Sequence, residues 1–160
     1  NLNEKYNYYV NMDLDNVNVK LNIDSIKRLL NSDLEWDVAS ANQITDYYDL
    51  WALRTNKNPK TPPSGPWRKG ALNIHNWFDN DEINFNDFNG ISINNKPIKV
   101  LSAFGGFCIY IMDKIKNCRY TGVKHDGNSI IEDCEHVIFH KEIREKNGGD
   151  KQYIIPYLIN

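Results

Sequence analysis

The sequence contains no hydrophobic run long enough to cross a lipid bilayer. Its longest apolar patches, residues 107–112 and 153–159, are far shorter than the roughly 18–20 apolar residues that a membrane-spanning helix needs. No signal peptide is visible near the start of the sequence either. We therefore expect no membrane span.

Clusters of basic residues are also missing. The 19 Lys and Arg residues are outnumbered by 21 Asp and Glu residues, and the formal net charge is −2. The basic residues are scattered and do not alternate with aromatic residues, whereas nucleic-acid-binding proteins usually concentrate them in a stripe. Nucleic acid is therefore not an expected partner.

Cysteine is scarce, and the three cysteines have no regular spacing. An odd number of irregularly placed cysteines does not form the pattern of a disulfide framework. No Asn-x-Ser/Thr glycosylation acceptor occurs, although Asn is abundant. Both absences favour a reducing compartment, and we expect a cytoplasmic protein.

What is present fits one folded domain. The 160 residues, of which 41% are hydrophobic and 25% charged, can bury a core without support from metal or disulfides. We expect a single domain over residues 1–160. A long proline-rich loop at 55–70 interrupts it and could serve as a lid.

Strand-like and helix-like patterns alternate along the chain, which is typical of α/β proteins. We expect a mixed, mostly parallel sheet flanked by helices. The expected strands are a buried one at 7–12, one at 36–41, a hairpin at 91–93 and 98–103, a short one at 119–121 and a closing one at 151–159. The expected helices span about 23–31, capped by Asn22 or Asp24, then 109–116 and 131–146.

The strongest chemical signal is the Asp-x-Asp pair Asp13 and Asp15, which directly follows an apolar strand. Ligands of open α/β sheets bind beyond the carboxyl ends of strands. Two carboxylates there can share a hard divalent cation such as Mg²⁺ or Mn²⁺, and Asn16 could add a hydrogen bond. Seen in isolation, the pair could equally be a solvated loop, which is what we expect of a second copy at 79–81.

The second signal is an acidic and histidine-rich stretch. On a helix, Glu132, Glu135, His136 and His140 would lie near one face. The dipole favours acidic residues at a helix N-terminus regardless of function. The functional interpretation is that a carboxylate takes a proton from an acceptor hydroxyl, while a histidine contacts a metal or a leaving diphosphate.

Two other metal sites have less support. An EF-hand calcium loop is excluded, because Val17 and Asn18 occupy its fifth and sixth positions. A zinc site built from Cys134, His136 and His140 could form, but it lacks a partner Cys-x-x-Cys pair.

The third signal is the segment Phe104-Gly105-Gly106-Phe107. Paired glycines allow a ligand to approach the backbone closely, and the flanking rings could stack on a sugar. A tight strand-to-helix turn would explain the glycines equally well. The sequence has no Gly-x-x-x-x-Gly-Lys-Ser/Thr motif, so a P-loop is not supported.

In this order, the segments resemble the GT-A fold family of nucleotide-sugar-dependent glycosyltransferases. The shared features are an apolar strand ending in Asp-x-Asp, a helix, a strand, the Phe-Gly-Gly-Phe turn and a Glu-Asp-led helix that closes at Gly-Gly. The resemblance implies a Rossmann-like α/β fold. It also implies transfer of a sugar from a nucleotide-diphosphate sugar to a glycan or another hydroxyl acceptor.

The resemblance further implies a donor and metal site. Asp13 and Asp15 would hold Mn²⁺ or Mg²⁺ and the donor diphosphate, and Asn16 would lie beside them. His136 or His140 would complete the metal shell. Arg54, in an aromatic stretch at 47–54, would contact the donor.

A catalytic and acceptor site follows from the same resemblance. The catalytic carboxylate would come from Glu132, Asp133 or Glu135, and the sequence does not separate Asp133 from Glu135. The acceptor would lie against Asp49, Gly105, Gly106 and Phe107. The family's nucleotide-binding βαβ units normally precede the Asp-x-Asp strand, whereas only 12 residues precede Asp13. We therefore expect this sequence to be the metal- and acceptor-binding part of such an enzyme.

Two other functions stay open. A sugar nucleotidyltransferase would use the same Mg²⁺ chemistry, but it usually has a basic, glycine-rich phosphate loop near the chain start, and none is seen. A non-catalytic carbohydrate- or protein-binding module would fit the 9 Tyr and 4 Trp residues, which could build a sugar-stacking surface.

Overall fold

The computed structural model describes residues 5–43, 45, 47, 49–57, 78, 83–85, 90–127 and 129–160. Most of the expected proline-rich loop at 55–70 and the second Asp-x-Asp copy at 79–81 lie outside these residues.

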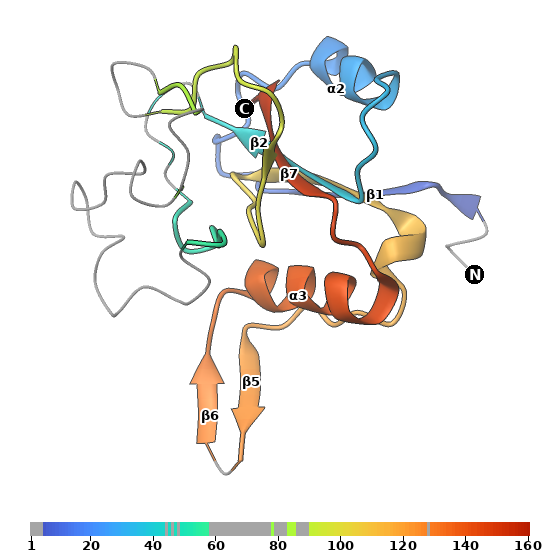
Figure 1. Ribbon diagram of the computed structural model, residues 1–160, viewed down its shortest axis with the longest axis vertical. Helices are drawn as coiled ribbons and strands as arrows, with labels where there is room; N and C mark the ends of the chain where they lie inside the picture. Colours follow the sequence, from blue (N-terminus) through green and yellow to red (C-terminus); the bar gives the residue numbers. More distant parts are fainter. Residues whose placement is uncertain are drawn as a thin grey trace.

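The described core is a five-stranded mixed sheet with the strand order β1-β4-β2-β7-β3 (Figure 1). Its strands are β1 (Tyr8–Met12), β2 (Val38–Asn42), β3 (Ile98–Lys99), β4 (Phe107–Ile111) and β7 (Gln152–Ile159). β2 and β7 run parallel, while the pairings β1–β4, β4–β2 and β7–β3 are antiparallel. The fold is an α/β mixed sheet, but the expectation of a mostly parallel sheet is wrong.

Strand β4 accounts for two of the three antiparallel pairings. The sequence predicts a helix over 109–116, but the strand runs to Ile111, and only Met112–Ile115 form a helical turn, the 3₁₀ segment η2. β4 has a neighbouring strand on each side and is almost fully buried. Its side chains are therefore apolar without interruption, a pattern that hydrophobic periodicity does not distinguish from a buried helix.

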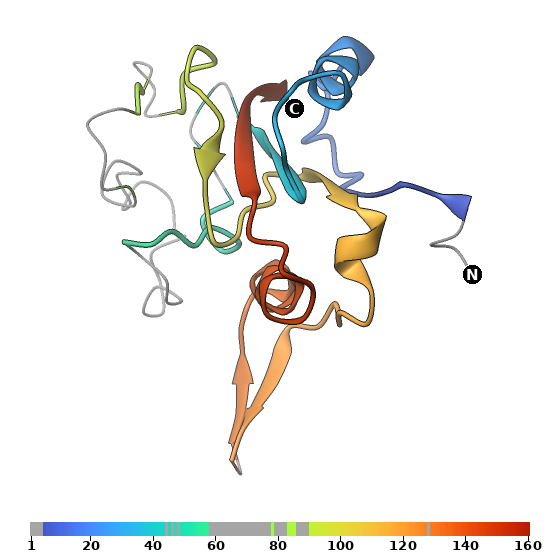
Figure 2. The same ribbon diagram turned by 45° about the vertical axis from the view of Figure 1, so that its right-hand side comes forward.

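The helices α2 (Ile23–Leu30) and α3 (Glu135–Asn147) pack on opposite faces of this sheet (Figures 1 and 2). Leu29 of α2 packs in a cluster with Ala39, whereas Phe139 of α3 packs with Val38. Because successive residues of a strand point to opposite faces, the two helices cover different sides of β2. Neither described helix is long and apolar enough to cross a membrane.

The first helix confirms its sequence prediction, and the second does so in part. The side chain of Asn22 accepts the Ser25 N–H at 2.8 Å, which caps α2 as expected. α3 begins at Glu135, not at residue 131, because 129–132 form strand β6 (Ser129–Glu132). β6 pairs with β5 (Val123–Asp126) in a hairpin that projects from the end of α3 (Figure 1).

Two smaller strand predictions are wrong. Residues 91–103 do not form the expected hairpin, since Ile91 bridges to Phe85 while β3 pairs with β7. The expected strand at 119–121 is not present, and the nearest strand is β5. Both segments are short, and their partners are distant in sequence, so local patterns carry little information about them.

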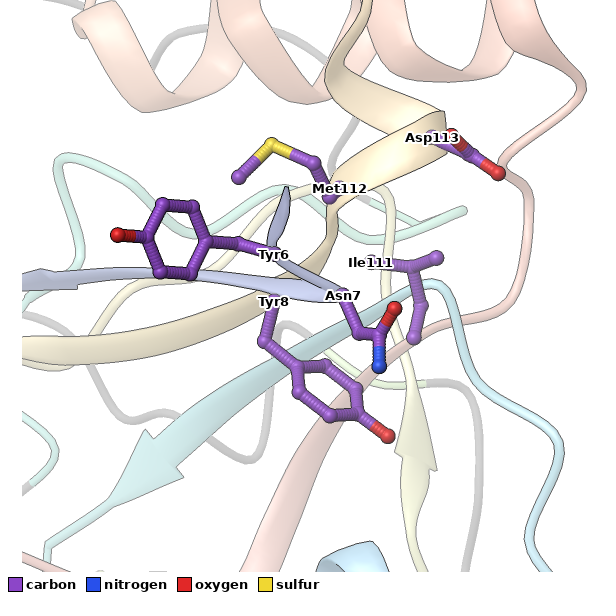
Figure 3. Close-up of a pocket in the computed structure, with 6 residues that line it drawn as sticks. All are labelled: Tyr6, Asn7, Tyr8, Ile111, Met112 and Asp113. Carbon is purple, nitrogen blue, oxygen red and sulfur yellow. The ribbon is translucent and has the colours of Figure 1, made fainter. Parts of the chain in front are cut away.

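Strand β1 is an exposed edge and not the buried strand that the sequence suggests. Tyr8, Val10 and Met12 are 42%, 49% and 42% exposed. Figure 3 shows a pocket of about 170 Å³ at the start of β1, lined by Tyr6, Asn7, Tyr8, Ile111, Met112 and Asp113. The pocket lies at the opposite end of β1 from Asp13, so it is not part of the Asp-x-Asp region.

The glycine turn before β4 brings two backbone segments into close contact. Gly105 and Gly106 have φ angles of +66° and +84°, which side chains rarely permit. A Cβ atom on Gly105 would lie 2.8 Å from the Ala41 carbonyl oxygen and 2.9 Å from Gln43 Nε2. The turn can therefore pass beside the end of β2 only because residue 105 has no side chain.

Replacing Gly105 with alanine should destabilise the fold by about 3 kcal/mol or more, because left-handed strain of about 1–2 kcal/mol adds to overpacking of about 1–3 kcal/mol. Gly127→Ala is the matched control. Its φ of +59° is similar, but a Cβ there meets no atom within 4 Å. Urea unfolding of both variants measures the difference. Equal losses would show that contact with β2 does not constrain the turn.

Candidate functional site

Asp13 is held at the end of β1, beside the glycine turn. The β1–β4 ladder ends at the Met12–Phe107 pair, and the Asp13 N–H donates to the Gly106 carbonyl at 2.9 Å. The Asn18 side-chain amide donates to the carbonyl oxygens of both Asp13 and Gly106, at 2.7 and 2.9 Å. The backbone of the Asp-x-Asp motif is thus fixed to the turn, while the side chains of Asp13 and Asp15 are exposed.

A network of side-chain amides completes this anchor. Gln43 Nε2 donates to the Gly105 carbonyl at 2.6 Å, and the Asn160 amide also donates to that carbonyl. Asn160 in turn donates to Asn18 Oδ1 at 3.0 Å and accepts from Gln43 at 3.2 Å. Asn18, Gln43 and Asn160 belong to no sequence motif, because these amides come from three distant segments and meet only after folding.

Acidic side chains from separate segments converge around this turn. Partial burial raises the pKa of Asp13, and the negative charges of Asp15 and Glu135 raise it further. Such shifts require close approach, since exposed charges are screened within about 8–10 Å. Asp13 therefore lies within electrostatic range of Asp15 and of Glu135, the first residue of α3.

Asp49 belongs to the same acidic region. Burial raises the pKa of its carboxyl group to about 6, and the charges of Asp13 and Glu135 contribute, although the N–H groups of Gly105 and Ala52 oppose the shift. Asp49 accepts the Gly105 N–H at 3.0 Å and the Ala52 N–H at 3.3 Å. The Asp49 carboxylate thus anchors the glycine turn at Gly105.

The three candidate catalytic carboxylates have different surroundings. Glu135 is the first residue of α3 and keeps a partly exposed side chain, 41% accessible. Asp133 forms an ion pair with Arg54 at 2.9 Å, in which the side chains are only 9% and 2% exposed. Glu132 is exposed on the hairpin, opposite Val123. Of the three, Glu135 combines exposure with proximity to Asp13.

The Arg54 side chain is buried and makes hydrogen bonds within the protein. Besides Asp133, its guanidinium donates to the backbone carbonyls of Trp51 and Leu53, at 3.0 and 2.7 Å. Asp133 also accepts the Cys134 N–H at 2.9 Å. The ion pair therefore ties the aromatic stretch at 47–54 to the start of α3 and fixes where Glu135 projects.

The two candidate metal-binding histidines lie on the buried side of α3. His136 Nε2 is 2.9 Å from the Tyr120 hydroxyl, and the ring stacks on Phe104 at 3.8 Å between centroids. His140 is fully buried, with Nε2 3.1 Å from the Tyr110 hydroxyl. Burial lowers the pKa of both rings, that of His136 to about 4. The structure packs these rings in the core and does not group them with Asp13 and Asp15.

The remaining predicted residues line the region through their backbone or are buried. Gly105 and Gly106 form the turn described above. Phe107 is 3% exposed and packs in the cluster around Leu29, so its ring faces α2 rather than solvent. Asn16 is exposed in a left-handed conformation, φ +71°, and turns the chain after Asp15.

The donors available for a divalent metal ion are carboxylates. Within the described residues, no three His, Cys, Asp or Glu side chains form a group that could hold a metal ion. Mg²⁺, however, is commonly held by one or two carboxylates together with substrate phosphates and water. Asp13 and Asp15 supply hard oxygen donors of this kind. Desolvation is the main cause of the raised pKa of Asp13, and a cation there would offset the smaller contribution from the charges of Asp15 and Glu135. The pair therefore fits a cation shared with a phosphate ligand.

Comparisons of the chain with protein families, with curated proteins and with solved structures gave no match.

Removal of one partner of the buried Arg54–Asp133 ion pair should destabilise the fold strongly. Asp133→Ala leaves a buried guanidinium without its carboxylate, and removal of one buried partner typically costs about 3–5 kcal/mol. Asp150→Ala is the control, since the Lys99–Asp150 pair is exposed, 58% and 66%, and such pairs contribute less than about 1 kcal/mol. Chemical unfolding measures both. A loss at Asp133 no larger than that at Asp150 would contradict this assignment.

The Asp49 carboxyl group should make stability depend on pH. Its folded pKa of about 6 lies above the unfolded value near 3.9, so the folded protein binds the proton more tightly between these values. Stability should therefore fall as the pH rises from about 4 to about 6, by on the order of 2 kcal/mol. Asp49→Asn should remove this fall, whereas Asp113→Asn should keep it. Urea unfolding across this pH range is the measurement, and identical profiles for wild type and Asp49→Asn would be the contrary result.

Proposed function

We propose that the protein acts as a metal-dependent glycosyltransferase, transferring a sugar from a nucleotide-diphosphate sugar to a glycan or another hydroxyl acceptor. The observation that carries the proposal is the shared electrostatic environment of Asp13, Asp15 and Glu135. Asp13, at the end of β1, is hydrogen-bonded to Gly106. The charge of Glu135, at the start of α3, acts on Asp13 and on Asp49, which accepts the Gly105 N–H. A cation site and a general base need this proximity, because donor and acceptor react side by side.

The donor side of the proposed reaction uses Asp13 and Asp15. A divalent cation held there would neutralise negative charge on the diphosphate as it leaves. The exposed side chains of both residues leave room for phosphate oxygens and water in the remaining coordination positions. The Asn18 amide supports this geometry, since it fixes the Asp13 backbone to the turn.

The acceptor side uses Glu135 as the general base. The acceptor oxygen forms a bond to the anomeric carbon of the sugar while the bond from that carbon to the diphosphate oxygen breaks. The bonding pair leaves with the diphosphate, and the acceptor proton passes to the Glu135 carboxylate. We assign this role to Glu135 and not to Asp133, because the Asp133 carboxylate is buried against the Arg54 guanidinium.

The same carboxylates would serve a sugar nucleotidyltransferase, and a sugar-binding module would need neither carboxylate chemistry nor metal. The acidic convergence favours metal chemistry over simple sugar binding, because repelling carboxylates destabilise a fold unless a ligand uses them. The reaction products distinguish the enzyme classes. A transferase releases nucleoside diphosphate, whereas a nucleotidyltransferase releases pyrophosphate.

Asp15→Asn should abolish sugar transfer while leaving the fold largely intact, because Asp15 is exposed and its replacement removes one cation donor. The assay offers a panel of nucleotide sugars with Mn²⁺ and follows nucleoside diphosphate and glycosylated acceptor. Mn²⁺ binding, followed by electron paramagnetic resonance, should weaken about tenfold or more. Asp113→Asn, at the other end of the β1–β4 pair, is the matched control and should retain transfer and Mn²⁺ binding.

Glu135→Gln tests the proposed general base separately from the proposed cation site. It should reduce transfer by about 10²–10⁴-fold and leave Mn²⁺ binding close to that of wild type. Undiminished transfer by Asp15→Asn would refute the metal role. Glycan binding that needs neither Mn²⁺ nor nucleotide, without any transfer, would favour the binding module instead.

A further inference from the structure

Tyr120 lies at the edge of the proposed site, although its sequence context gives no sign of a role. Its ring meets those of His136 and Phe139 edge-on, with centroids 5.2 and 5.6 Å apart. The hydroxyl lies 2.9 Å from His136 Nε2 and 3.4 Å from Glu135 Oε1. It is therefore placed between a buried ring and the proposed base.

The backbone that carries Tyr120 is firmly anchored. Glu142 of α3 accepts the Arg119 N–H at 2.7 Å and the Arg119 side chain at 2.9 and 2.7 Å. Lys146 donates to the same carboxylate at 2.7 Å. Burial would raise the pKa of Glu142, but these donors outweigh it and hold the pKa at about 2. Tyr120 is thus fixed relative to α3, on which Glu135 also lies.

The protonation of His136 decides which way the hydrogen bonds run. The ring is buried and neutral near pH 7, so it carries one N–H. Its Nδ1 atom is buried without a hydrogen-bond partner in the part of the chain that the structure describes. A buried N–H without an acceptor is rarer than a buried acceptor without a donor. We therefore assign the proton to Nε2, which in that tautomer donates it to the Tyr120 hydroxyl oxygen.

The Asn11 side chain also hydrogen-bonds the Tyr120 hydroxyl and acts to lower its pKa, as a donor to the oxygen does. With His136 and Asn11 as donors, the phenol proton of Tyr120 points to Glu135. We propose that Tyr120 is a positioning residue for the general base, in a chain in which His136 donates to Tyr120 and Tyr120 donates to Glu135. Hydrogen bonds to a carboxylate are shorter and stronger than neutral ones, and the 3.4 Å separation can shorten when substrate closes the site.

This series of hydrogen bonds also connects Glu135 to the glycine turn. His136 stacks on Phe104 at 3.8 Å, and Phe104 directly precedes Gly105. The turn, the histidine, the tyrosine and the carboxylate are therefore in successive contact. A base fixed in this way keeps a constant distance to an acceptor bound at the turn, and positioning of reacting groups affects the rate more than the affinity. The functional part of this inference rests on the proposed glycosyltransferase activity.

Tyr120→Phe tests the chain with readouts that do not depend on activity. In the wild type, ¹⁵N shifts should show the Nε2–H tautomer of His136, and three-bond couplings should show one dominant Glu135 rotamer. The variant should lose the single Glu135 rotamer. Tyr110→Phe is the matched control, because it removes the corresponding phenol from His140 and should leave Glu135 unchanged. An Nδ1–H tautomer, or a Glu135 rotamer unaffected by Tyr120→Phe, would overturn the proposal.

Steady-state kinetics of the same two variants provide a second test. Tyr120→Phe should lower kcat about tenfold with KM and Mn²⁺ binding nearly unchanged, whereas Tyr110→Phe should change kcat little. An unchanged kcat in Tyr120→Phe, beside an active wild type, would overturn the positioning role. If the wild type transfers no sugar, the proposed function fails, and the His136 tautomer and Glu135 rotamer still decide whether Tyr120 orients this carboxylate.

Discussion

The close passage of Gly105 beside the Ala41 carbonyl is the constraint on which the site depends. Since a Cβ there would lie 2.8 Å from that oxygen, the backbone can reach this position only without a side chain. The turn then feeds β4 into the sheet between β1 and β2. It also presents its carbonyls to Asn18 and Gln43 and one of its N–H groups to Asp49. The absence of a side chain at residue 105 thereby brings together the segment after β1, the segment after β2 and the segment that carries Asp49.

Local sequence patterns predicted helix α2 and the positions of two strands of the sheet. Helix α2 has an apolar stripe and an Asn22 cap, so its start and type follow from the sequence. Strand β7 is apolar after Gln152, whereas β2 includes the polar residues Ser40 and Asn42, and both strands lie close to their predicted positions. β4 is equally apolar, but the spacing of Ile109 and Met112 also suits a helix. Only its neighbours in the sheet decide that it is a strand, and those pairings are not visible in one sequence.

The site residues also fall into two groups, those that the sequence indicates and those that only the structure shows. Asp13, Asp15 and Glu135 could be selected because carboxylates at a strand end and a helix start have chemical meaning by position. The difference between Asp133 and Glu135 is visible only in the structure, since Asp133 is paired with Arg54, 79 residues away. Tyr120 was missed for the same reason. Its contacts are with two side chains on a helix that begins 15 residues later, and the sequence around it has no recognisable motif.

The distribution of charge gives the strongest physical reason to regard this region as functional. Elsewhere the protein compensates its buried or half-buried acids, as Glu142 shows with Arg119 and Lys146. The charged neighbours that raise the pKa of Asp13, in contrast, are themselves acids. Folding gains nothing from such an arrangement, because like charges at close range destabilise the compact state. Under the proposed function, a bound cation would reverse the sign of that interaction, and the repulsion among these carboxylates would become affinity for a divalent ion shared with a phosphate ligand.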